Sequence, residues 1–94
     1  MDLDIVHDID RHRFTASVEG YTCVLDYGIS QGVMTIYHTG VPAAVGGRGI
    51  AAELTRTAFE TARINDWKVA PDCSYAAAYL RRHPELEPLR YRIR

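Results

Sequence analysis

A glycine-rich turn at residues 46–51 is the part of this sequence whose residue types could most directly do chemistry. The turn reads Gly46-Gly47-Arg48-Gly49-Ile50-Ala51. Glycine lets a ligand approach the main chain without a Cβ in the way, and the first turn of a helix presents unpaired amides with a partial positive charge. Because strand-like residues precede the turn and helix-like residues follow it, we predict an anion site that suits a diphosphate, with Arg48 adding a charged contact at its rim.

Two other phosphate motifs compete for this turn. A P-loop requires Gly-Lys-Ser/Thr after its glycines, and Gly49 is followed here by Ile50 and Ala51, which excludes that motif. Residues 47–52 do satisfy the glycine pattern of a dinucleotide site, with Asp66 or Asp72 near the spacing of a ribose contact. A dinucleotide-binding fold starts with its strand-turn-helix unit, whereas in this chain several strand-like runs precede the glycine turn. The order of elements therefore argues against a dinucleotide site. A glycine-rich connection without a ligand is the remaining alternative.

Composition excludes several classes of protein. A chain of 94 residues suffices for one domain, which we expect to span residues 1–94. Hydrophobic residues make up 47% and charged residues 24%, as in ordinary globular proteins, and a net charge of -1 offers no general attraction to nucleic acid or anionic membranes. No run approaches the ~20 apolar residues of a membrane span, and the start lacks a signal pattern, so we expect a cytoplasmic protein.

The cysteines and the basic C-terminal region complete the compositional picture. Cys23 and Cys73 lie far apart and lack a paired histidine spacing, so we predict free thiols and no metal site. Arginines gather in the last fourteen positions, at Arg81, Arg82, Arg90, Arg92 and Arg94. They indicate either a solvated helix face and tail or an edge that docks anions.

The elements that must position the glycine turn begin with strands. Apolar and polar residues alternate in three runs, at 14–18, 21–25 and 33–37. Glu19-Gly20 and Gln31-Gly32 supply turns of hairpin length, and residues 5–6 are expected to form a first edge strand. Connections this short predict an antiparallel meander.

A helix is predicted directly after the glycine turn. Its apolar stripe recurs every four residues, at Ile50, Leu54, Ala58 and Ala62. Asn65-Asp66 ends this helix, and residues 67–70 read as a strand that returns parallel to the sheet. The predicted fold class is therefore α/β, a mixed and mostly antiparallel sheet with one parallel strand-helix-strand crossover and two main helices.

The second helix is predicted to follow Pro71, with Asp72 or Ser74 as its cap. It runs to about Arg82, because the residue before Pro84 is pushed out of helical geometry. Residues 86–94 read as a poorly defined tail.

Four segments together resemble one protein family. They are His38-Thr39-Gly40-Val41-Pro42, the glycine turn through Leu54, Val69-Ala70-Pro71-Asp72-Cys73-Ser74-Tyr75 and Tyr79-Leu80-Arg81-Arg82-His83-Pro84-Glu85. They are similar to the GNAT superfamily of N-acetyltransferases, specifically its short, stand-alone, single-domain branch. The superfamily motif begins with Gln or Arg where this chain has Gly46, so one side-chain contact to the pyrophosphate is missing.

The resemblance implies a site for acetyl-coenzyme A as a cosubstrate. The pantetheine arm would lie between two splayed parallel strands, around residues 37–41 and 67–70, with the pyrophosphate on residues 47–51. The implied coenzyme-binding residues are Val41, Gly46, Gly47, Arg48, Gly49, Ile50, Ala51, Ser74 and Tyr75. Backbone amides near Val41 would hold the thioester carbonyl, so no side chain is needed there.

Tyr79 and Cys73 are the candidate catalytic residues. Superfamily members often carry a tyrosine in this helix that protonates the departing thiolate, which points to Tyr79; core packing beside Tyr75 is the alternative. A helix start lowers the pKa of a thiol, so Cys73 is interpreted as a nucleophile or as a residue lining the acceptor pocket, with an inert buried thiol as the alternative. Direct transfer is preferred over an acetyl-Cys73 intermediate, because the splay already places the thioester beside the acceptor.

We therefore expect an acetyl-coenzyme A dependent N-acetyltransferase that acts on a primary amine. The acceptor stays open among a protein lysine, a terminal amine and a small polyamine. His38 is not assigned, since a strand histidine usually bonds a neighbouring carbonyl. A non-catalytic module that binds coenzyme A or its acyl forms and acts through protein contacts is the alternative function, and a structural domain without a ligand is the third.

Overall fold

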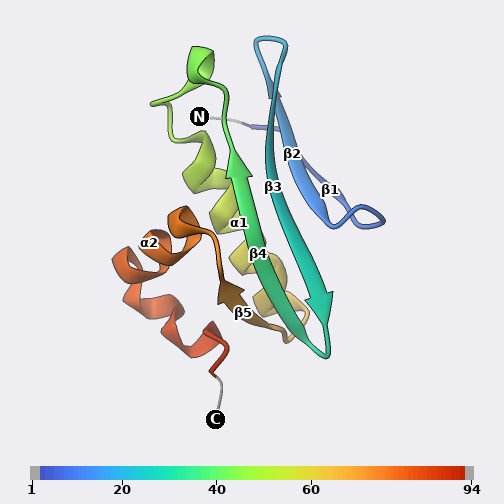
Figure 1. The fold of residues 1–94 in the computed structure, drawn as a ribbon, viewed down its shortest axis with the longest axis vertical. Helices are drawn as coiled ribbons and strands as arrows, with labels where there is room; N and C mark the ends of the chain where they lie inside the picture. Colours follow the sequence, from blue (N-terminus) through green and yellow to red (C-terminus); the bar gives the residue numbers. More distant parts are fainter. Residues whose placement is uncertain (1–2, 93–94) are drawn as a thin grey trace.

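A computed structural model describes residues 3–92 of the chain. Its elements in order are β1 (Ile5–Asp8), β2 (Arg13–Val18), β3 (Tyr21–Ser30), β4 (Val33–Gly40), the 3-10 helix η1 (Ala43–Val45), α1 (Ile50–Ile64), β5 (Lys68–Pro71), α2 (Ser74–Arg82) and the 3-10 helix η2 (Pro84–Leu89). The strands form one sheet in the order β1-β2-β3-β4-β5, and α1 covers one face of it (Figure 1). The predicted α/β class is confirmed.

Two-residue turns set the register of the antiparallel meander. Glu19 and Gly20 have φ of 51° and 83°, and Gln31 and Gly32 have φ of 51° and 76°. Positive φ at both central residues matches the twist of the flanking strands, which is why such turns close tight hairpins. β3 and β4 extend beyond the predicted runs, because their pairing continues through a bulge beside Asp26 as far as Gly40.

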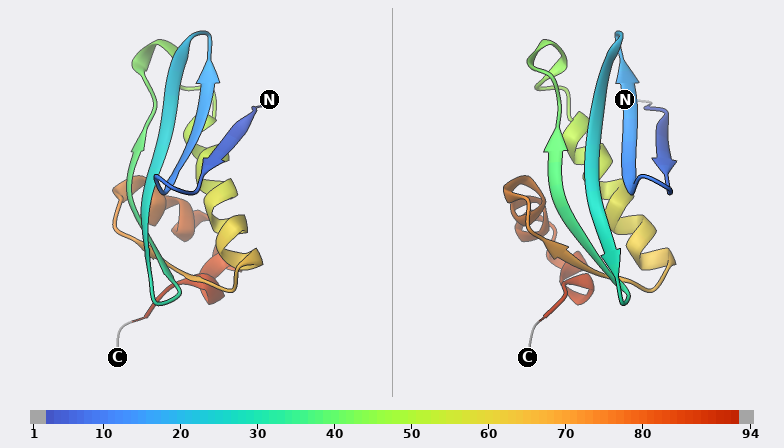
Figure 2. Two further views of the ribbon diagram at one scale, coloured as in Figure 1. Left: turned by 90° about the vertical axis from the view of Figure 1, so that its right-hand side faces the viewer. Right: turned by 45° about the vertical axis from the view of Figure 1, so that its right-hand side comes forward.

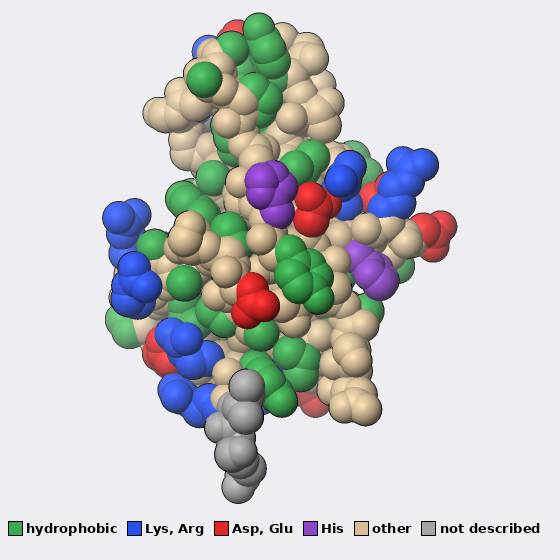
Figure 3. Space-filling model, in the orientation of Figure 1, with side chains coloured by type: hydrophobic (Ala, Val, Ile, Leu, Met, Phe, Trp, Pro, Cys, Tyr) green, Lys and Arg blue, Asp and Glu red, His purple; other side chains and the backbone are tan. Residues whose placement is uncertain are grey.

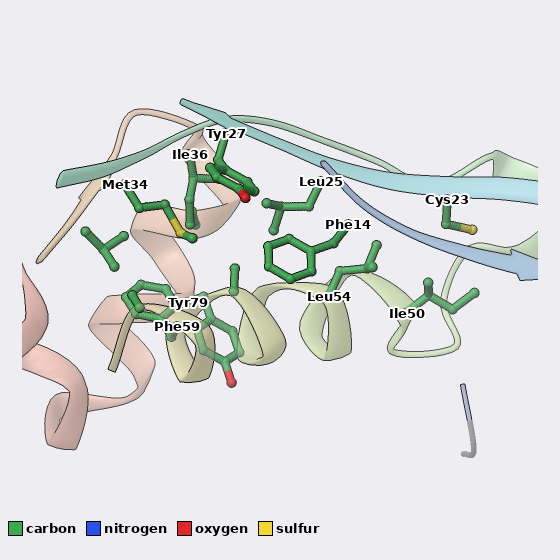
Figure 4. Close-up of a cluster of buried hydrophobic side chains, with 14 of the residues drawn as sticks. Phe14, Cys23, Leu25, Tyr27, Met34, Ile36, Ile50, Leu54, Phe59 and Tyr79 are labelled. Carbon is green, nitrogen blue, oxygen red and sulfur yellow. The ribbon is translucent and has the colours of Figure 1, made fainter. Parts of the chain in front are cut away.

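The core lies between the sheet and α1. The predicted stripe of Ile50, Leu54, Ala58 and Ala62 is buried, and Phe59 joins it. Figure 4 shows these helix side chains meeting side chains from the strands, among them Phe14, Leu25, Met34 and Ile36. Each fully buried side chain of this size stabilises the fold by about 1.5–3 kcal/mol relative to its exposed state.

The crossover returns to the sheet as predicted, because β5 pairs in parallel with β4, Lys68 opposite Val33 and Pro71 opposite Ile36. The predicted cap of α2 is wrong. Cys73 is the N-cap, rather than Asp72 or Ser74, and its backbone is extended with φ of -76° and ψ of 134°. Its N–H donates to the Ile36 carbonyl at 2.9 Å, so a contact with β4 determines where the helix begins.

The C-terminal segment is more ordered than the sequence predicted. α2 ends before Pro84 as expected, and η2 then carries the chain back to the free edge of β5, where the Tyr91 N–H donates to the Val69 carbonyl at 2.8 Å. The two views of Figure 2 show this segment packed beside β5 and α2. The predicted tail is therefore wrong for most of its length, and Arg94 lies outside the described residues.

The predicted cluster of arginines is divided between two environments. Arg81 and Arg82 are exposed at the end of α2, whereas Arg90 and Arg92 form ion pairs with Glu87. Figure 3 shows Lys and Arg side chains along the side of the molecule that α2 forms. Within residues 3–92, no helix is both long enough and apolar enough to cross a membrane.

Candidate functional site

The candidate site begins where β4 and β5 separate. Their parallel pairing ends at Ile36 and Pro71, while β4 continues to Gly40. After Pro71 the chain enters α2, so residues 37–40 of β4 face the N-terminus of a helix instead of a strand on that edge. These residues are the free end of β4, and the space between them and the start of α2 is the gap. The gap that the resemblance implied is present beside residues 37–40, but residues 68–71 are paired and the gap opens only after them.

A cavity of about 230 Å³ lies between the end of β4, the start of α1 and the start of α2. It is lined by Val41, Gly46, Gly47, Gly49, Ile50, Ala51, Ala52 and Tyr75. All the coenzyme-binding residues named from the sequence line it except Arg48 and Ser74. Ala52 was missed, although its position in the first turn of α1, next to Ala51, is a signal that could have placed it there.

The glycine turn leaves open space in front of the helix. Gly47 and Gly49 have φ of 76° and 82°, a left-handed conformation that glycine adopts without strain. A Cβ added to either residue would meet no atom within 4 Å. Gly49 is the N-cap of α1 and supplies no side-chain cap, so the first amides of the helix retain the capacity to bind an anion.

Arg48 does not line this cavity, because its side chain is bound to the β2–β3 turn. Its Nη1 donates to Glu19 Oε2 at 2.6 Å, and its Nη2 donates to Glu19 Oε1 at 3.4 Å. The hydrogen bond to Arg48 and the charge of its guanidinium hold the pKa of Glu19 below its ordinary value. Sequence reasoning missed this pair, since the two residues are 29 positions apart and no local pattern connects them.

Cys73 lies at the gap, half-buried at the start of α2. Its Sγ is 3.6 Å from Thr39 Oγ1 on the free end of β4. Burial opposes ionisation of the thiol, but contacts with the Ala76 backbone, with Thr39 and with the Tyr75 backbone outweigh it, and the pKa of Cys73 is lowered. A thiolate is the nucleophilic form of cysteine, so this environment favours reactivity. Cys23, in contrast, is fully buried in the core.

The two tyrosines of α2 occupy different surroundings. Tyr79 is 8% exposed and packs between Phe59 and His83, with ring centroids 5.9 Å and 4.0 Å away. Burial raises the pKa of its phenol. Figure 4 shows the Tyr79 ring among the core side chains beneath the sheet. Tyr75, one helical turn earlier, is the tyrosine that lines the cavity.

His38 is exposed on the face of the sheet away from α1, opposite Asp26 on β3. Its Nε2 lies over Gly40, where an added Cβ would approach it to 2.8 Å. Among the hydrogen bonds found in residues 3–92, none involves the imidazole, so the carbonyl bond usual for a strand histidine is not observed. The imidazole therefore remains available to solvent close to the gap.

Comparison with known proteins gives a consistent family. A model of the family described as GCN5-related N-acetyl-transferase matches residues 13–89. The chain is 32% identical over 85 residues to Protein NATD1 of Gallus gallus, a match that covers 87% of this chain and 77% of that protein. It is also 32% identical over 83 residues to Protein NATD1 of Homo sapiens, covering 85% of this chain and 74% of the human protein.

A solved structure shares the fold. The NMR solution structure of a GCN5-like protein from Staphylococcus aureus aligns with a TM-score of 0.76 and covers 98% of this chain and 91% of that one. Sequence identity is 23%, so this likeness concerns the arrangement of helices and strands.

Proposed function

Because the chain belongs to the GCN5-related N-acetyltransferase family, we propose that it uses acetyl-coenzyme A as a cosubstrate and transfers the acetyl group to a primary amine. The observation that carries this proposal is the cavity in front of α1. Its lining combines the glycine turn, the free end of β4 and the start of α2, which are the three elements that an extended coenzyme would need at once.

The cavity suits the two chemically different parts of the cosubstrate. The uncapped amides at the start of α1 would receive the diphosphate, since they are donors beside open space. The pantetheine arm would run along the edge of β4 that lacks a strand partner. A volume of about 230 Å³ is below the ~300–1,000 Å³ of pockets that enclose a whole ligand, which fits partial enclosure of a long molecule.

The chemistry requires a stabilised oxyanion and a proton for the leaving thiolate. Backbone N–H groups near Val41 would hold the thioester carbonyl. Tyr79 is the proposed acid, and Tyr75 competes for that role because it lines the cavity. Cys73 would either line the acceptor pocket or act as a nucleophile. As a nucleophile, its thiolate would attack the carbonyl carbon of the thioester. The bond from that carbon to the coenzyme sulfur then breaks, and the departing coenzyme thiolate takes up a proton.

The acceptor amine and the location are proposed at a general level. A small molecule or a protein amine is proposed as the acceptor, and neither nucleic acid nor a membrane is proposed as a partner, because the net charge is -1. We propose the cytoplasm as the location, since Cys23 and Cys73 are both free and thiols persist in a reducing compartment.

Thermal unfolding with and without acetyl-coenzyme A tests the proposed site. Ligand at about 100 times its dissociation constant adds roughly 2.7 kcal/mol, and each kcal/mol raises the midpoint of a domain of this size by about 4–8 °C. Ala51→Glu should abolish the shift, because it places a carboxylate where the diphosphate would bind, whereas glutamate suits the first turn of a helix and preserves the fold. Ala51→Gln is the matched control for side-chain size without charge.

Release of free thiol in the presence of varied amines tests the activity. Acetyl-coenzyme A binding with release above the uncatalysed rate supports transfer. Binding without any release would favour the alternative of a non-catalytic coenzyme A binding module. An unchanged melting temperature at millimolar acetyl-coenzyme A would contradict both.

A further inference from the structure

The contact between the β2–β3 turn and the glycine turn has no role in the chemistry described above. Both turns lie at the same end of the molecule in Figures 1 and 2, and the ion pair between Glu19 and Arg48 joins them. The two-residue turn places Glu19 with φ of 51°, so the position of this residue is set by the hairpin and not by a mobile loop. The contact is therefore built from two tightly constrained backbone segments.

The geometry of the pair is a fork. Two nitrogens of the Arg48 guanidinium donate to the two oxygens of the Glu19 carboxylate, at 2.6 Å and 3.4 Å. Carboxylates and phosphates present similarly spaced oxygen pairs, and the planar guanidinium binds either of them in this way. The two donating nitrogens of the guanidinium bind one pair of anionic oxygens at a time, so a carboxylate and a phosphate compete for Arg48.

The backbone of Arg48 lies beside the proposed diphosphate site. Gly47 and Gly49, its two neighbours in the chain, line the cavity, while the Arg48 side chain is held outside it by Glu19. A diphosphate on the amides of this turn would have the Arg48 guanidinium within one side chain's length.

We propose that Glu19 holds Arg48 in a contact that the coenzyme diphosphate displaces, so that Glu19 sets the affinity of the protein for its cosubstrate. The inference rests on the proposed function, because it assigns a role to residues at the edge of that site. In the free protein the carboxylate neutralises Arg48. In the complex the guanidinium exchanges the carboxylate for the diphosphate, and ligands that lack a paired anion leave the contact with Glu19 intact.

Binding of coenzyme A to the parent protein and to Glu19→Gln, measured by calorimetry at low salt, tests the exchange. Exposed ion pairs of this kind contribute modestly, so the variant should bind coenzyme A about two- to fivefold more tightly. Glu60→Gln is the matched control, because Glu60 forms a similarly exposed pair with Arg63 near the far end of α1 and its loss changes the net charge equally. Its affinity should equal that of the parent protein.

A double-mutant cycle identifies the route through Arg48. Arg48→Gln should weaken coenzyme A binding, and adding Glu19→Gln to it should produce no further change. Tighter binding on adding Glu19→Gln in that background would overturn the exchange, since the carboxylate would then act on the ligand directly. Weaker binding by the single Glu19→Gln variant would also overturn it, because Glu19 would then orient Arg48 toward the ligand.

Dephospho-coenzyme A distinguishes the diphosphate from the 3′-phosphate of the ribose. The gain in affinity of Glu19→Gln should persist with this ligand, and a gain seen only with coenzyme A would contradict the diphosphate as the displacing group. If the parent protein binds neither ligand, the proposed function itself fails and this inference falls with it. Normal binding with an unaffected Glu19→Gln variant would remove the inference alone.

Discussion

The sulfur of Cys73 lies 3.6 Å from the hydroxyl oxygen of Thr39, and this contact joins the start of α2 to the free end of β4. The thiol therefore stands at the mouth of the gap where a thioester would arrive, with its pKa lowered by its backbone and hydroxyl neighbours against the opposing effect of burial. Its position and its lowered pKa together make Cys73 the residue whose role is most informative to test.

We expect direct transfer of the acetyl group, without a covalent intermediate on Cys73. Intact-protein mass spectrometry after incubation with acetyl-coenzyme A and no acceptor should show no added acetyl group. Cys73→Ser should retain turnover within a few fold, because serine keeps the size of the side chain and its contact with Thr39. An acetylated Cys73 that passes its acetyl group to an added amine would establish the covalent route instead.

The two tyrosines of α2 should separate in a kinetic comparison. A hydroxyl that only protonates the leaving thiolate contributes little to ground-state binding, so its removal lowers kcat and leaves the affinity for the coenzyme nearly unchanged. Tyr79→Phe is expected to show this pattern, with kcat lower by about 10²-fold if the residue is the acid. The same pattern in Tyr75→Phe, with normal turnover in Tyr79→Phe, would assign the proton to Tyr75 and leave Tyr79 to packing.

Substitution of Gly49 should cost stability as well as binding. Gly49 has φ of 82°, and a residue other than glycine in this conformation costs about 1–3 kcal/mol. Gly49→Val should therefore lower the midpoint of thermal unfolding by at least several degrees and lose coenzyme binding. Gly46→Ala is the control, since Gly46 has an ordinary φ of -69° and should keep its midpoint. Equal midpoints for the parent and Gly49→Val would contradict the left-handed conformation.

Local patterns in the sequence predicted the elements well, because each depends on neighbouring residues. The stripe from Ile50 to Ala62 places the buried face of α1, and the glycines of two dipeptides, Gly20 and Gly32, mark both hairpin turns. The glycine turn likewise identified most of the cavity lining, because those residues are adjacent in the chain.

Contacts distant in the sequence account for what was missed. Cys73 became the N-cap of α2 because its N–H bonds Ile36, far back along the chain, and the side-chain preference of Asp72 or Ser74 did not decide the matter. Glu19, the partner of Arg48, lies in the turn of the β2–β3 hairpin. The C-terminal segment is ordered by its contact with the free edge of β5. No periodicity or capping signal carries such information.

The stability of the fold should fall below neutral pH through His7 on β1. The His7 ring stacks on Phe14 with centroids 4.1 Å apart, and its Nε2 lies 2.5 Å from the Tyr27 hydroxyl. Burial, opposed by the charge of Asp8 and assisted by His12, lowers the pKa of His7. In the unfolded chain a histidine has a pKa of about 6.5, so as the pH falls the unfolded state binds a proton at His7 before the folded state does. Protonation therefore favours unfolding.

The contribution of His7 is therefore complete above about pH 6.5 and declines as the pH falls from there through the lowered pKa of the folded state. Urea unfolding of the parent protein and of His7→Gln, measured at intervals from pH 7.5 to 5, isolates this effect, because the carboxylates are common to both proteins and cancel in the difference. The parent protein should lose stability faster than the variant across that interval. Glutamine keeps a polar group beside the Tyr27 hydroxyl but does not titrate. Parallel curves of unfolding free energy against pH for the two proteins would show that protonation of His7 does not destabilise the fold.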